Sequence, residues 1–144
     1  MTSFSGPDLV PDARDALSDA QCRELLATRV FGRVAITSGA LPCILPVCYV
    51  FDDNAIVFRT GAGTKLRSAA SGDVLAFEVD DYDRETGRGW SVLVFGRASV
   101  LTTEHEHDGL PTVDGYRFEG ERNHYVRLEC ELVSGRTIET THRP

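Results

Sequence analysis

The residues with the clearest chemical potential are gathered in one short segment, Arg59–Lys65. It ends on the only lysine of a chain that otherwise carries fourteen arginines. Two glycines in the segment allow a turn to present backbone N–H groups, two threonines add hydroxyl donors, and a cation stands at each end. A strand is expected before this turn and a helix after it, so the helix N-terminus would add partial positive charge. The segment therefore predicts a phosphate site, although an ordinary connecting loop with a stray cation would leave the same pattern.

Composition limits the class of protein. The chain has 144 residues, 42% of them hydrophobic and 26% charged, which predicts one globular domain. Its formal net charge of −7 argues against a nucleic-acid partner, because phosphate contact needs a basic face. The first ten residues lack both a basic start and an apolar run, and the longest apolar stretch, 41–51, is too short to span a membrane. We therefore expect a cytoplasmic protein with no membrane partner.

Cysteines and histidines do not form a metal-binding pattern. Cys43 and Cys48 are five residues apart, a spacing that does not suit a zinc pair, and a chain of this length does not need disulfides. His105 and His107 stand in an acidic loop, where a solvated polar loop is the more common outcome. We therefore predict no metal site. We also assign no catalytic side chain, because Cys43 lacks an identifiable base partner.

Hydrophobic periodicity predicts two short helices and six or seven strands. Ser18 and Gln21 form a capping-box pattern at the start of the first helix. The expected helices are 18–29 and 64–71, and the expected strands are 32–38, 41–51, 55–60, 73–82, 89–101, 124–133 and 136–140, the last following a turn at 134–135. Residues 1–17 are predicted to be a loosely ordered arm, and residues 18–144 a single domain.

The predicted connections decide between sheet architectures. Strands joined mainly by hairpins favour an antiparallel barrel over a parallel sheet. The predicted fold is therefore mainly β, an antiparallel six- to seven-stranded split β-barrel with a few short helices. Pro42 and Pro46 stand within one strand, and proline cannot donate to a ladder. That strand should therefore have an edge, a bulge or a ligand-facing stretch there.

Five segments in this order carry a family resemblance. They are Gly32–Ala35, Ile44–Tyr49, Val57–Lys65, Ala76–Asp80 and Gly89–Arg97. The chain resembles the pyridoxamine 5′-phosphate oxidase-like family of FMN-binding split barrels, in the branch that includes nitroimidazole-resistance proteins. The similarity runs from about residue 25 to about residue 135. Many relatives have a histidine where this chain has Cys43, which puts the chemistry linked to that histidine in doubt.

The resemblance implies an FMN cofactor at a homodimer interface and flavin-mediated hydride or electron transfer with an unknown small molecule. The residues that would hold the FMN phosphate are Arg59, Thr60, Thr64 and Lys65. The residues that would offer backbone groups to the flavin ring are Pro46, Val47 and Cys48. The strand that meets the flavin in relatives corresponds here to Trp90 and Ser91. A flat apolar slot, a few backbone hydrogen bonds and cations at the phosphate are what a flavin needs.

Several alternatives stay open at this point. Related split barrels bind the deazaflavin F420 or haem instead of FMN. The chain could also be a non-catalytic flavin-binding protein or a sensor, because no catalytic residue is assigned. An oligonucleotide-binding barrel is disfavoured by the acidic charge. The acidic stretch 103–121 could cover the site as a lid, and the sequence does not decide this.

Overall fold

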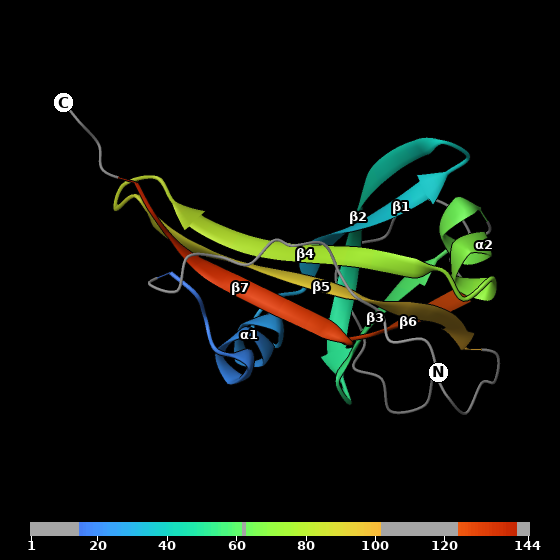
Figure 1. Cartoon of the computed structure of the whole chain (residues 1–144), viewed down its shortest axis with the longest axis horizontal. Coiled ribbons are helices and arrows are strands. Elements are labelled where there is room, and N and C mark those ends of the chain that lie inside the picture. The colour runs from blue at the N-terminus through green and yellow to red at the C-terminus, as the bar shows by residue number, and fades with distance from the viewer. Residues whose placement is uncertain (1–14, 62, 102–123, 141–144) are drawn as a thin grey trace.

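The computed structural model of the chain describes residues 15–61, 63–101 and 124–140, and for residues 64–66 it describes the backbone alone. Two helices and seven strands make up these residues (Figure 1). They are α1 (Asp19–Leu26), β1 (Phe31–Ser38), β2 (Leu41–Asp52), β3 (Ala55–Thr60), α2 (Thr64–Ala70), β4 (Val74–Asp83), β5 (Arg88–Leu101), β6 (His124–Glu129) and β7 (Leu132–Glu139). None of the helices in this part of the chain is long and apolar enough to cross a membrane.

The strands form a closed antiparallel barrel with one strand outside it. The ladder runs β4-β1-β2-β3-β6-β5-β7, and an additional β4–β5 pairing closes the first six strands on themselves. In Figure 1, β4, β5 and β7 extend as a long twisted ribbon beyond the barrel, with α1 against this ribbon and α2 near the opposite end of β4. The predicted mainly β split barrel is therefore confirmed.

Alternating side chains fill the barrel. Along β4, Leu75, Phe77 and Val79 are buried, whereas the residues between them face outward. Tyr49 of β2 meets the Phe77 ring edge-on at 4.7 Å between ring centroids, and its hydroxyl donates to the Leu26 carbonyl oxygen at 2.7 Å. This bond connects the end of α1 to the barrel interior, because a buried tyrosine hydroxyl needs a partner.

One predicted strand boundary is wrong. The expected turn at 134–135 lies inside β7, and the expected strand 124–133 instead breaks between β6 and β7. Both strands use the same edge of β5: Phe95 pairs with Leu132, and Ala98 pairs with Leu128. Between these pairs, residues 96–97 of β5 face residues 129–131 of the segment that joins β6 to β7, so the ladder is interrupted there.

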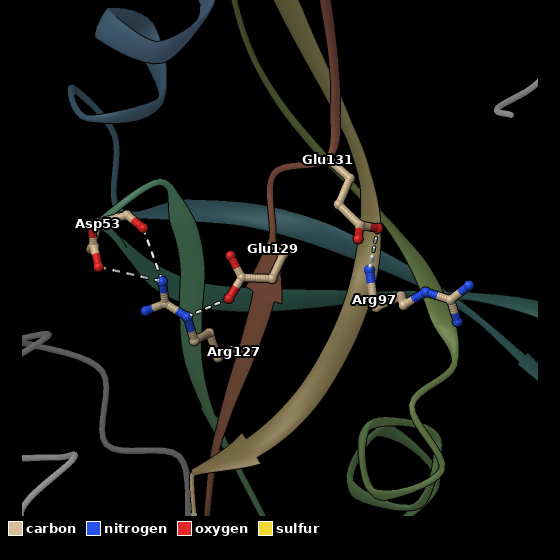
Figure 2. A network of polar contacts seen from close by, with 5 residues as sticks. All are labelled: Asp53, Arg97, Arg127, Glu129 and Glu131. Carbon is tan, nitrogen blue, oxygen red and sulfur yellow. Dashed lines mark hydrogen bonds and ion pairs between the residues drawn. The ribbon is translucent and has the colours of Figure 1, made fainter. Parts of the chain in front are cut away.

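A close approach of two backbones fixes the position of this break. A Cβ atom added to Gly96 would lie 1.7 Å from the Glu129 carbonyl oxygen, so only glycine fits. Glu131 then accepts the Arg97 backbone N–H through its carboxylate at 3.0 Å, as Figure 2 shows. These contacts occur between residues more than thirty positions apart. Local periodicity therefore could not place the break.

The turn between β2 and β3 is held to β6 by an arginine. Asp53 and Asn54 both have positive φ (45° and 60°), as a two-residue hairpin turn requires. Arg127 donates to the Asp53 carbonyl oxygen at 2.9 Å and to the Glu129 carboxylate at 2.6 Å (Figure 2). The guanidinium therefore links the β2–β3 turn to β6 at this end of the barrel.

Helix α1 begins as predicted. The Ser18 hydroxyl accepts from the Gln21 backbone N–H at 3.1 Å, and the Gln21 side chain accepts from the Ser18 N–H at 2.8 Å. Just before it, Leu17 donates to the Gly135 carbonyl oxygen, and Asp15 accepts from Thr137. The described end of the predicted N-terminal arm thus lies along β7. The boundary between arm and domain stays a prediction.

Candidate functional site

Strand β2 has an open edge in its first half. Tyr49 donates its backbone N–H to Val30, so odd-numbered residues of β2 direct N–H groups toward β1 and even-numbered residues direct them away. Pro42 and Pro46 therefore stand where the missing N–H would point to the far edge. Among the described strands, residues 41–46 have a ladder partner on the β1 side alone. The predicted strand edge at the prolines is confirmed.

Two predicted site residues meet where this edge opens. Tyr49 and Phe58 form the first pair between β2 and β3, so Cys48 and Arg59 flank that pair side by side. Cys48 is half-buried on the outer side of β2, and the Arg59 guanidinium lies 5.6 Å from the centroid of the Tyr125 ring. A fixed cation thus stands next to the backbone that could receive a flat ring.

The predicted phosphate turn joins β3 to α2. Thr60 ends β3 and is 3% exposed, and its hydroxyl donates to the Gly61 carbonyl oxygen at 3.2 Å. Gly63 has φ 152° and is the N-cap of α2, where it has no side chain to accept from the first N–H groups of the helix. The backbone of Thr64 and Lys65 forms the first turn of α2, and their side chains lie outside the described atoms.

Two predicted ring-contact residues differ in orientation. Val47 is buried in the core, so it could offer only backbone groups. Pro46 is exposed on the outer side of the sheet, opposite Arg33 of β1. Both placements are compatible with the prediction that this segment offers backbone rather than side chains.

Trp90 and Ser91 lie away from the turn within one copy of the chain. Thr60 pairs with His124, next to the pair of Tyr125 with Leu101 at the end of β5. Trp90 stands eleven residues before Leu101, about 35 Å of extended strand away. The fold therefore does not bring the third predicted segment to the turn in a single protomer.

The side chains of Trp90 and Ser91 face opposite sides of the sheet. Trp90 packs toward the core, with the Arg29 guanidinium 5.4 Å from its ring centroid, and Arg29 also pairs with Asp81 at 2.6 Å. Ser91 faces the outer side, opposite Asp80 of β4. Ser91 therefore belongs to the same sheet face as Pro46, and Trp90 does not.

A charged cluster lies on this outer face between the two predicted ring-contact segments. The cross-strand rows run from Pro46 through Arg33 to Glu78, and on to β5. Arg33 Nη2 lies 2.6 Å from Asp80 Oδ1 and 3.2 Å from Glu78 Oε1. The latter oxygen is buried without a well-aligned hydrogen bond. One guanidinium thus serves two carboxylates.

The two carboxylates share this charge unequally. Burial, together with the neighbouring Asp80 carboxylate, raises the pKa of Glu78 to about 7. Burial by itself would raise the pKa of Asp80, but the hydrogen bond from Glu78 and the Arg33 guanidinium lower it overall. Glu78 is consequently a group that can hold a proton near neutral pH while Asp80 stays ionised.

Sequence reasoning missed this cluster. Asp80 and Asp81 lie near the end of β4, and both pair with arginines. The alternation around Arg33 and around Glu78 could have placed each side chain outward, but no local pattern pairs residues 45 positions apart. His105 and His107, and the acidic stretch 103–121, lie outside the described residues. The described residues contain no group of three or more metal-ligating side chains.

A sequence profile described as pyridoxamine 5′-phosphate oxidase matches residues 18–137, most of the chain. The chain belongs to the pyridoxamine 5′-phosphate oxidase family. The predicted family resemblance is thereby confirmed. Among curated proteins, protein Rv0080 of Mycobacterium tuberculosis is 39% identical over 87 residues, which cover 57% of each chain. The chain spans only 44–57% of the length of the curated relatives it matches.

Solved structures agree with this family. The FAD binding protein from Mycobacterium smegmatis is 31% identical, covers 88% of this chain and 99% of its own, and has a TM-score of 0.72. An FAD-binding protein from Mesorhizobium loti is 24% identical, with 87% and 96% coverage and a TM-score of 0.73. The FAD and Heme binding protein from M. smegmatis is 17% identical, with 88% and 74% coverage and a TM-score of 0.67. The last two likenesses show the fold alone.

Proposed function

We propose that this chain is a homodimeric flavoprotein that holds a flavin nucleotide at its open β2 edge and exchanges hydride or electrons with a small molecule. The single observation that carries the proposal is the junction of Cys48 and Arg59. There the first half of β2, which among the described strands has a ladder partner in β1 alone, ends beside a cation, directly before a glycine turn that leads into a helix. This combination suits a flat ring followed by a phosphate.

The phosphate assignment follows from the same junction. Arg59 and Lys65 would neutralise the phosphate, and the N–H groups of the turn and of the first turn of α2 would donate to it. Thr60, with its hydroxyl turned to the Gly61 carbonyl, would contribute its backbone rather than its side chain. Pro46, Val47 and Cys48 would border the ring with backbone groups.

The outer sheet face supports a homodimer. Phe31, Ile44 and Leu132 are 43%, 71% and 37% exposed, and all three lie on the face that carries the Arg33 cluster. Exposed apolar side chains gathered on one face favour a protein partner, and a second copy is the commonest one. A second copy could also supply Trp90 and Ser91 to a turn that they do not reach within their own chain.

Similarity supports the class of cofactor. The relative that is 31% identical over nearly its whole length binds FAD by name, and another, more distant neighbour binds FAD and haem by name. Among the candidate cofactors, a flavin is therefore better supported than F420 or haem. The smaller cofactor, FMN, needs only the phosphate turn.

The turn, the outer face and Glu78 would each have a separate role at the flavin. A bound flavin supplies the hydride or electron transfer. The turn would bind and orient it, and the exposed apolar side chains of the outer face would exclude water when two copies meet. Glu78 would hold a proton on that face near neutral pH. The alternative is a non-catalytic flavin carrier or sensor with the same binding residues.

The test begins with the purified protein. We expect a yellow homodimer whose released cofactor has the mass of a flavin nucleotide, and whose visible bands fade on addition of NADH or NADPH. Absorption bands of a deazaflavin or of haem would show that the bound cofactor is not a flavin. A bound flavin that no nicotinamide donor reduces would favour the carrier role. Colourless monomer that takes up neither FMN nor FAD would overturn the proposal.

A further inference from the structure

An open polar pocket of about 240 Å³ lies between α2 and the tip of the β1–β2 hairpin. Its lining includes Ser38 from the hairpin, Arg67, Ser68 and Ser71 from α2 and its end, and Asp73 from the start of β4. We infer that this pocket takes the adenylate half of FAD, so that the protein prefers FAD to FMN. This inference rests on the proposed flavin binding and adds the identity of the nucleotide.

The chemistry of the lining suits a nucleoside phosphate. A carboxylate such as Asp73 accepts from the two hydroxyls of a ribose, which is how dinucleotide sites commonly bind ribose. A guanidinium such as Arg67 donates to a phosphate, and serine hydroxyls donate or accept as needed. A ligand with a diol and an anionic group therefore matches this lining better than a simple anion, which Asp73 would repel.

The position of the pocket follows the predicted path of the nucleotide. Positions 64, 67, 68 and 71 recur at helical spacing, so they lie along one side of α2. Position 64 follows the phosphate turn, and Ser71 stands two helical turns later, about 11 Å along the axis. A dinucleotide whose first phosphate lies at the turn would therefore place its second phosphate and its ribose in the pocket.

The pocket is held in shape by backbone contacts. Asp73 donates its N–H to the Ser68 carbonyl oxygen at 3.0 Å, and its own carbonyl accepts from Ala98 at 3.0 Å. Ser68 is 6% exposed. The backbone of Asp73 is thus fixed on both sides, which lowers the ordering cost of binding a ligand at this residue.

The experiment compares FMN, FAD and AMP on the full chain freed of any copurified cofactor. Wild type should bind FAD more tightly than FMN, and free AMP should compete with FAD but not with FMN. Asp73→Asn and Arg67→Gln should each weaken FAD binding on the order of tenfold and leave FMN binding within about twofold. Arg23→Gln, on α1 and paired with Asp19, is the matched control and should change neither.

The outcomes separate the two proposals. FMN and FAD bound equally, with both pocket variants unchanged, would overturn the pocket and leave the flavin site standing. Equal losses of FMN and FAD in the variants would assign these residues to the first phosphate and also overturn the pocket. Binding of neither flavin by wild type would overturn the proposed function and the pocket together. Thermal unfolding of each variant checks that the fold is retained.

Discussion

Arg33 on β1 and Glu78 on β4 are direct cross-strand neighbours on the outer sheet face, and the same arginine nitrogen lies closer to Asp80 than to Glu78. The arginine neutralises one carboxylate, and the second keeps its proton to higher pH. The outer face therefore carries a group that changes charge near neutral pH, amid the apolar side chains proposed for the dimer interface.

Replacement of Glu78 by glutamine should change how stability depends on pH. The pKa of Glu78 is raised from 4.5 to about 7 in the folded protein, so the folded state binds this proton more tightly than the unfolded state. The resulting stability is present below about pH 4.5 and is lost as pH rises through about 7. Relative to Glu78→Gln, wild type should lose about 1 kcal/mol between about pH 5 and pH 8, a value reduced because the carboxyl is a third exposed.

Urea unfolding of both proteins at the two pH values measures this difference. Asp80 does not contribute to it, because its pKa is lowered from 3.8 and it stays ionised throughout this window. Glu85→Gln, on the exposed β4–β5 hairpin, retains Glu78 and is the control, so its difference in unfolding free energy from wild type should be the same at both pH values. An unfolding difference independent of pH for Glu78→Gln would contradict the shared-proton arrangement.

Replacement of Lys65 by alanine should weaken FMN binding roughly ten- to hundredfold, because one charge-assisted hydrogen bond to the phosphate contributes about 1.5–3 kcal/mol. Riboflavin, which has no phosphate, should bind wild type and variant equally. Fluorescence titration with both ligands measures the two affinities. Arg23→Ala, on α1, removes a cation outside the proposed site and should leave both unchanged. A parallel loss of riboflavin and FMN would mean that Lys65 supports the ring rather than the phosphate.

Introduction of a charge at Ile44 should produce a monomer. Ile44 is 71% exposed in one protomer, so Ile44→Glu should change the unfolding free energy of a single protomer by no more than about 0.5 kcal/mol. A buried carboxylate without a partner in the proposed interface would cost far more. Light scattering after gel filtration should show the loss of the dimer, together with loss of bound flavin. Val30→Glu, at a residue 59% exposed, should remain dimeric, and a dimeric Ile44→Glu would place the interface elsewhere.

Addition of one methyl group at Gly96 should strongly destabilise the barrel. The new Cβ atom would lie 1.7 Å from the Glu129 carbonyl oxygen, so one of the two strands must move. We expect Gly96→Ala to lose at least about 2 kcal/mol of unfolding free energy in urea. Gly39→Ala meets no atom within 4 Å but has φ 63°, so about 1–2 kcal/mol is expected there. If Gly96→Ala lost no more unfolding free energy than Gly39→Ala, the two strands would be able to move apart at little cost.

Local patterns were sufficient for most elements and for part of the site. The capping box of Ser18, the strand 55–60 and the start of α2 at Thr64 follow from residue types a few positions apart. The open edge of β2 also followed from local chemistry, since Pro42 and Pro46 lack the N–H that a second ladder partner would need. The break between β6 and β7 did not, because it depends on a contact between Gly96 and Glu129.

The sequence by itself determined the alternation of each strand, the glycine turn with its two cations, and the family to which the chain belongs. These are short-range properties, encoded by neighbours along the chain. Only the tertiary structure decided that Arg33 pairs with both Glu78 and Asp80, and that Trp90 lies far from the phosphate turn. Those relationships depend on strand register and barrel closure, which many distant side chains set together, so no single stretch of residues specifies them.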